Sequence, residues 1–139
     1  MIKDIMRDPM FLALKSQDAG KEDTQVIQDL KDTIQHYKDQ CVGMAANMIG
    51  VQKRIIIFYS EESKGYQVML NPTIIKTSGQ PFQVMEGCLS LVGERKTKRF
   101  PRIKVQYQDC DMKIKMKSYD GFTAQIIQHE IDHCNGIVI

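Results

Sequence analysis

The segment QHEIDH, residues 128–133, carries two histidines four positions apart and a glutamate directly after the first. If the segment is helical, His129 and His133 lie about 6 Å apart along the axis and nearly in line, so both imidazoles can bind one metal ion. Glu130 then lies about 100° around the helix from His129. There it can remain beside the ion without binding it and accept a proton from an attacking water, which predicts a metal-dependent hydrolase.

A helix with two solvated histidines is the alternative interpretation. Phe122 and Ile126 continue the stripe of His129 and His133, which places the histidines on the face expected to meet the core. Two unpartnered imidazoles in a core would be costly, so we favour the metal site. His36, the third histidine, falls near the polar face of an earlier helix and is expected to be solvated.

Two histidines do not complete a catalytic metal site, which usually takes three protein ligands and leaves one position open. Cys88, in VMEGCLSL, is the candidate third ligand. Gly87 permits an unusual backbone path before it, and the Leu89 N–H can face the same site. A thiolate and two imidazoles then form the site. For Cys110 and Cys134 we expect the usual fate of a free cysteine, that of a small buried hydrophobe.

The length of 139 residues predicts one domain spanning 1–139. No apolar run approaches the ~20 residues of a membrane span. The first residues are interrupted by charges and a proline, which does not predict a signal peptide. A net charge of +2 argues against a dominating polyanionic partner. Four cysteines without an export signal favour a reducing, cytoplasmic setting.

The elements that must position these residues follow from periodicity. An amphipathic helix is predicted over 24–41, with Gly43 just past its end, and a second over about 122–135. Strands are predicted at 54–60, 66–72, 103–107 and 113–119, with the prolines at 72, 81 and 101 marking loops or strand ends. Helices and strands that do not alternate predict an α+β fold with a largely antiparallel sheet.

Three segments together resemble, in order and spacing, the signature motifs of the peptide deformylases: the glycine/alanine stretch at 43–46, EGCLS at 86–90 and QHEIDH at 128–133. DPMFLALKS near the beginning and the NP at 71–72 extend the resemblance over nearly the whole chain. It implies mostly antiparallel sheets packed around a central HExxH-bearing helix, with an amphipathic helix toward the N-terminus. It also implies removal of the formyl group from the N-terminal methionine of nascent polypeptides, which releases formate.

In that family Fe²⁺, often replaced by Ni²⁺, Co²⁺ or Zn²⁺ in purified samples, is held by one cysteine and two histidines. The matching positions are Cys88, His129 and His133. Glu130 matches the general base, which accepts a proton from water and passes it to the leaving amine. The Leu89 backbone N–H matches a donor to the developing oxyanion.

The resemblance also implies how the substrate binds. Val42 and Gly43 match positions whose backbone pairs with the peptide as an added strand. Ile126, one helical turn from His129, is expected to line the pocket for the methionine side chain. The expected partners are N-formylmethionyl peptides and nascent chains, with possible transient contact to the ribosome, for a chain acting as a monomer.

The chain departs from the family at two positions of the first motif, which usually reads Gly-x-Gly-hydrophobic-Ala-Ala-x-Gln. Cys41 replaces the first glycine and Met48 replaces the glutamine. That glutamine ordinarily donates a hydrogen bond to the oxyanion, which a thioether cannot do. Loss of one such donor typically costs about 10²–10³ in turnover. The alternative is that Asn47, one position earlier, supplies the amide.

Three other functions remain as hypotheses. Met48 motivates a catalytically weak or silent protein that binds metal or formylated peptides, although the intact Glu130 argues against it. An endopeptidase is suggested by HExxH alone and disfavoured by Cys88. The basic run ERKTKRFPRIK, at 94–104, is typical of a solvated strand edge, so no specific nucleic-acid binding is expected.

Overall fold

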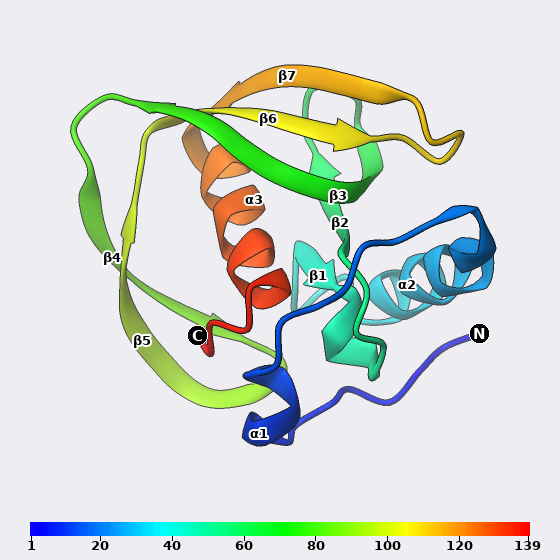
Figure 1. Ribbon diagram of the computed structural model, residues 1–139. Coiled ribbons are helices and arrows are strands. Elements are labelled where there is room, and N and C mark those ends of the chain that lie inside the picture. Colours follow the sequence, from blue (N-terminus) through cyan, green and yellow to red (C-terminus); the bar gives the residue numbers. More distant parts are fainter.

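The computed structural model describes residues 1–139 and places helix α3 between two antiparallel sheets, with α2 on the far side of the larger sheet (Figure 1). The α-helices are α1 (Pro9–Leu12), α2 (Thr24–His36) and α3 (Gly121–Cys134), and the 3₁₀ helices are η1 (Lys21–Asp23) and η2 (Ala46–Ile49). The strands are β1 (Gly43–Ala45), β2 (Ile55–Ser60), β3 (Gly65–Ser78), β4 (Phe82–Cys88), β5 (Leu91–Arg99), β6 (Arg102–Gln108) and β7 (Ile114–Asp120). The predicted α+β fold is confirmed.

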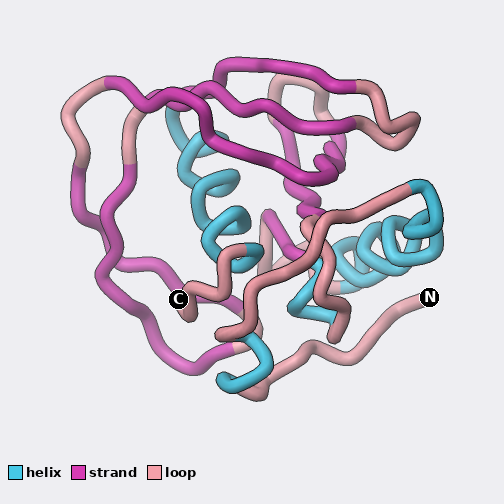
Figure 2. The backbone as a smooth tube through the Cα atoms, viewed as in Figure 1, coloured by secondary structure: helices cyan, strands magenta, loops and turns pink.

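The larger sheet has the strand order β1-β2-β3-β6-β7, and every pairing in it is antiparallel. The predicted hairpins are present: Ser60 pairs with Gly65 across one turn, and Gln108 pairs with Ile114 across the other. The second sheet is the β4–β5 hairpin. Figure 2 shows this hairpin running along the side of α3 and curving toward its C-terminal end.

Strand β2 is buried on both faces, which explains its unbroken run of isoleucines. Ile56 and Phe58 belong to the core cluster that includes Ile127 of α3. Ile55 and Ile57 point the other way, into a second cluster that includes residues of α2. Alternate side chains of a strand face opposite sides, so a strand covered on both sides needs apolar residues throughout. This packing fixes α3, and the site it carries, against the sheet.

Helix α2 is shorter than predicted. Its apolar positions Ile27, Leu30 and Ile34 are buried as the periodicity requires, but the helix ends at His36, which is exposed as expected. The next four residues form turns whose three polar members, Lys38–Gln40, are all exposed. A further helical turn there would have no apolar face to bury. The chain instead continues into β1, which pairs with β2. Gly43 therefore begins a strand and is not a helix cap.

The β4–β5 hairpin was not predicted from the sequence. VMEGCLSL, expected to connect strands, forms most of β4 and the turn, and much of the basic run 94–104 forms β5. Neither strand alternates cleanly between apolar and polar residues, because the hairpin packs on α3 through few side chains and is solvated over the rest. Pro72 lies inside β3, where the pairing with β6 shifts register and no ladder N–H is required.

Two burial predictions were wrong. Phe122 begins the expected core stripe but is 62% exposed. Cys110 lies exposed in the β6–β7 turn, whereas Cys134 is buried as expected. No helix is both long enough and apolar enough to cross a membrane.

Candidate metal centre

Helix α3 presents two imidazoles to the same point. His129 and His133 are buried one turn apart, and their Nε2 atoms lie 3.1 Å from each other. Cys88, at the end of β4, completes a group in which the three ligand atoms all lie within 4.8 Å of one another. The fold thus brings together the three residues predicted as ligands, from segments more than 40 positions apart in the chain.

The β4–β5 pairing is irregular next to Cys88, with the extra residues on the β5 side. The pairing of β4 with β5 shifts register between Glu86 and Cys88, and Cys88 then pairs with Leu91 across a two-residue turn. A Cβ atom built on Gly87 would lie 3.1 Å from the Gly93 carbonyl oxygen. Glycine relieves this crowding at the point where the strand must turn.

The outer nitrogen of His129 is held by a carboxylate. Glu86 Oε1 lies 2.8 Å from His129 Nδ1 and 2.7 Å from Arg99 Nη2. Gln125 Nε2 donates to Glu86 Oε2 at 2.8 Å, and Arg99 Nη1 donates to Asp132 at 2.6 Å. This network orients the His129 ring so that Nε2 faces the centre, which is how carboxylates usually support metal-binding histidines.

Arg99 and the role of Glu86 were missed by the sequence analysis. In the sequence, Glu86 stands within EGCLS and Arg99 within the basic run at 94–104, and no role in the site was predicted for either. Arg99 is almost completely buried, a burial that requires a partner for its charge. The signal available in the sequence was the pair of carboxylate and thiol in EGC, two positions apart on one strand and therefore on one face.

The surroundings of the histidines stabilise one positive charge. Burial lowers the pKa of His129, but the hydrogen bonds that its ring donates to Cys88 and Glu86 outweigh burial and raise that pKa to about 10. Burial and the neighbouring His129 charge lower the pKa of His133 to about 3. Burial opposes ionisation of Glu86, yet its bonds to His129 and Arg99 bring its pKa down to about 2. These three groups fit a divalent cation. Cys88 offers a sulfur, His133 offers a neutral imidazole, and the Glu86 carboxylate stabilises positive charge at His129.

Glu130 is buried beside this group and has an unpaired oxygen. The residue is 4% exposed and its Oε1 has no hydrogen-bond partner. Burial raises the pKa of Glu130 to about 7, partly offset by the charge of His129. An unsatisfied buried oxygen costs stability, and such groups concentrate where chemistry is done.

Close approach of β1 to α3 requires glycine at position 43. A Cβ atom built on Gly43 would lie 2.7 Å from Ile126 Cγ2 and 2.8 Å from Glu130 Oε2. Both distances are shorter than real Cβ contacts permit. Gly43 therefore allows the strand to pass directly beside the carboxylate.

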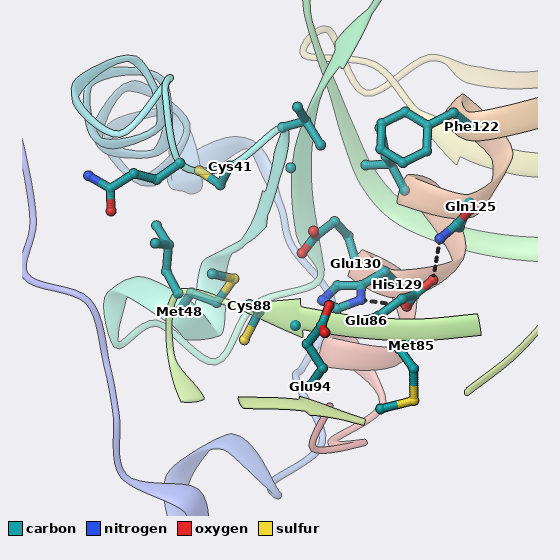
Figure 3. A pocket seen from close by; sticks show the side chains of 16 residues that line it. Cys41, Met48, Met85, Glu86, Cys88, Glu94, Phe122, Gln125, His129 and Glu130 are labelled. Carbon is teal, nitrogen blue, oxygen red and sulfur yellow. Dashed lines mark hydrogen bonds and ion pairs between the residues drawn. The ribbon is translucent and has the colours of Figure 1, made fainter. Parts of the chain in front are cut away.

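A cleft of about 260 Å³ opens beside these residues, with β1 and the β4–β5 hairpin as walls and α3 between them (Figure 3). The predicted residues that line it are Val42, Gly43, Met48, Cys88, Leu89, Ile126, His129 and Glu130. The Leu89 N–H donates no hydrogen bond to another backbone group of the chain, and its carbonyl accepts one from Arg7 Nη1 at 2.7 Å. The N–H is thus free for an oxygen atom in the cleft.

Met48, and not Asn47, faces the cleft. Met48 is almost completely buried in its wall, and its sulfur accepts a weak hydrogen bond from the Ala45 N–H at 3.5 Å. Asn47 Nδ2 donates to the His133 carbonyl oxygen at 2.9 Å, which commits the amide to the end of α3. The alternative in which Asn47 supplies the missing amide is therefore not supported.

Comparisons with known proteins identify the family of the chain. The family model of polypeptide deformylase matches residues 3–139. The chain is 50% identical to a peptide deformylase of Clostridium beijerinckii over an alignment that covers all of both chains. It is 37% identical to that of Dictyoglomus thermophilum, over all of this chain and 91% of the other.

Solved structures show the same fold. The actinonin-bound class I type b peptide deformylase of Acinetobacter baumannii superposes with a TM-score of 0.87 at 28% identity, covering 99% of this chain and 95% of that one. The peptide deformylase of Thermotoga maritima gives 0.86 at 27% identity, with coverage of 99% and 95%. The chain belongs to the peptide deformylase family.

Proposed function

We propose that this chain is a metal-dependent hydrolase that removes the N-formyl group from the N-terminal formylmethionine of nascent polypeptides and releases formate. The observation that carries the proposal is the unpaired, buried carboxylate of Glu130 beside the Cys88, His129 and His133 group. Family membership supports the same reaction.

Cys88, His129 and His133 would hold one divalent ion, most naturally Fe²⁺, with Zn²⁺, Ni²⁺ or Co²⁺ as substitutes. The bound ion supplies a Lewis acid that polarises the formyl group and acidifies water. Glu86 keeps the His129 ring turned toward the centre. These residues provide the ligand set and its orientation.

Glu130 would accept a proton as the water oxygen attacks the formyl carbon, and pass it to the amine nitrogen as the C–N bond breaks. The products are formate and a free N-terminal amine. The Leu89 N–H stabilises the negative charge that develops on the formyl oxygen. Met48 offers no donor to that oxygen, which leaves the stabilisation weaker than in relatives with glutamine there.

The substrate backbone would lie beside β1 at Val42 and Gly43, adding a strand to the sheet edge. Ile126 and Met48, which line the cleft, supply apolar surface for the methionine side chain. A solved relative from Acinetobacter baumannii contains bound Met-Ala-Ser, whose sequence corresponds to a deformylated product. This supports N-formylmethionyl peptides as substrates here.

We place the reaction in the cytoplasm, with the chain acting as a single domain and a monomer and touching the ribosome only transiently as the nascent chain emerges. No specific nucleic acid is involved. Family membership favours the enzyme over a silent metal- or peptide-binding protein.

Formate release from formyl-Met-Ala-Ser by the Fe²⁺-loaded protein, compared with a formylated peptide lacking methionine, tests the proposal. We expect formate from the methionine peptide and much slower release from the other, because the apolar surface of Ile126 and Met48 would bind the methionine side chain. Turnover no faster than that of free Fe²⁺ would leave the silent binding protein as the better account.

A further inference from the structure

We infer that Glu94 gives the cleft a charge preference for the residues that follow the formylmethionine: lysine or arginine at the second or third position is favoured over aspartate or glutamate. The inference rests on the proposed function, because it concerns which formylated peptides that site processes best. It assigns a specificity role to a residue outside the signature motifs.

Apart from His129 and the cation that it would bind, the charged side chains that line the cleft are all carboxylates. The carboxylates of Glu86, Glu94 and Glu130 line it, and no lysine or arginine does. Glu86 is neutralised by Arg99 and His129, and Glu130 is buried at the reacting end. Glu94 is exposed and makes neither a hydrogen bond nor an ion pair with its side chain. It is therefore the carboxylate that an incoming cation can reach without breaking an existing contact.

The position of Glu94 places this charge beside the substrate path. Its Cγ lies 3.5 Å from where a Cβ of Gly87 would be, so its stem crosses the glycine that precedes Cys88. Figure 3 shows its side chain among those that project into the cleft from the β4–β5 side. The next residue, Arg95, donates to the Val92 carbonyl at 3.1 Å and does not line the cleft. Its guanidinium does not neutralise Glu94.

Apolar side chains at the edge of the cleft can contact the methylene stem of a substrate lysine or arginine. Met85 and Phe122 line the cleft and are 53% and 62% exposed. The methylene stem of lysine or arginine packs on such surface while its head keeps contact with a carboxylate and water. An acidic residue at the same place would gain neither contact and would be repelled by Glu94.

The size of the effect follows from the exposure of Glu94. Exposed ion pairs contribute modestly, which corresponds to about two- to fivefold in kcat/KM between a basic and a neutral peptide. Salt screens such pairs, with a Debye length of about 3 Å at 1 M. The preference is therefore expected to fade at high salt.

The test compares kcat/KM for formyl-Met-Ala-Lys and formyl-Met-Lys-Ala with their glutamate and glutamine counterparts, using the metal-loaded protein and the variants Glu94→Gln and Glu94→Lys. Glu61→Lys is the matched control, because Glu61 is an exposed glutamate in the β2–β3 turn that makes no ion pair and does not line the cleft. The two lysine positions show which substrate residue faces Glu94.

We expect the ratio of lysine to glutamate peptide to exceed one for the unaltered protein at one or both positions, to approach one for Glu94→Gln and to fall below one for Glu94→Lys. Glu61→Lys should leave the ratio unchanged. Equal ratios in all four proteins, with formate released from every peptide, would overturn the role of Glu94 and leave the deformylase reaction standing. No release from any peptide would overturn the proposed function and this inference together.

Discussion

His129 and Glu86 meet at 2.8 Å, between Nδ1 of the imidazole and Oε1 of the carboxylate. The contact joins α3 to β4, so the ring that faces the metal position is oriented by the same strand that carries Cys88. Arg99 and Gln125 hold the Glu86 carboxylate in turn. The site is thus set by a hydrogen-bonded chain between two elements, in addition to the spacing of histidines on one helix.

Glu86→Gln should lower metal affinity by about 10- to 100-fold, because the amide still occupies the place of the carboxylate but loses the charge that supports His129. Competition with a chelator measures the affinity, and thermal unfolding of the same samples shows whether the fold is kept when Arg99 has only Asp132 as its ion-pair partner. Glu94→Gln, on the same hairpin but without a hydrogen bond or ion pair to Cys88, His129 or His133, is the matched control. Equal affinity for the Glu86 variant and the unaltered protein would show that the contact does not support the ion.

Met48→Gln should raise kcat by up to about 10²-fold, because it restores an amide donor where the oxyanion develops. Metal content should not change. Met48→Leu is the control, since it keeps a similar volume without a donor and should leave kcat unaltered. Our account of the oxyanion contacts is wrong if glutamine and leucine give the same kcat.

Gly43→Ala should reduce kcat/KM by about 10²-fold or more. The new methyl group would overlap the Glu130 carboxylate, which must then shift away from its observed position. Metal content is measured alongside and should be retained. Gly65→Ala serves as the control, since a Cβ there meets nothing closer than 4.0 Å. Full activity of the Gly43 variant would mean that Glu130 does not need its observed position.

Alkylation of the cysteines reports the metal site without an activity assay. Burial raises the pKa of Cys41 to about 11 and that of Cys134 to about 12, so both remain thiols and react slowly near pH 8. In the metal-loaded protein Cys110, which is exposed, should react alone, and after metal removal Cys88 should react as well. Mass spectrometry of the labelled protein counts the modified sites. Labelling of Cys88 at equal rates with and without the ion would argue against it as a ligand.

Much of the fold was predictable because the strongest patterns belong to buried elements. The isoleucines of β2 and the stripe of Ile27, Leu30 and Ile34 are set by packing on both sides of one sheet, and they mark these elements clearly in the sequence. The β4–β5 hairpin was not predictable in this way, since it is largely solvated and holds α3 through polar contacts.

The candidate site also contains some residues that the sequence predicts and some contacts that it does not. Cys88, His129 and Glu130 are identified by residue type and spacing, which the sequence displays directly. The burial of Arg99 and the commitment of Asn47 to the His133 carbonyl depend on how α3 packs against other elements. No local pattern encodes those contacts, so only the structure could distinguish Met48 from Asn47 as the residue facing the cleft.

Glu130→Gln provides the most direct test of the central claim, that a general base beside the Cys88, His129 and His133 group hydrolyses the formyl amide. Formate release from formyl-Met-Ala-Ser is measured for the metal-loaded protein and the variant, with metal content determined for both. The account predicts that the variant keeps its metal and loses about 10²–10⁴ in kcat, since general-base catalysis contributes that much. A variant that retains its metal and releases formate as fast as the unaltered protein would contradict it.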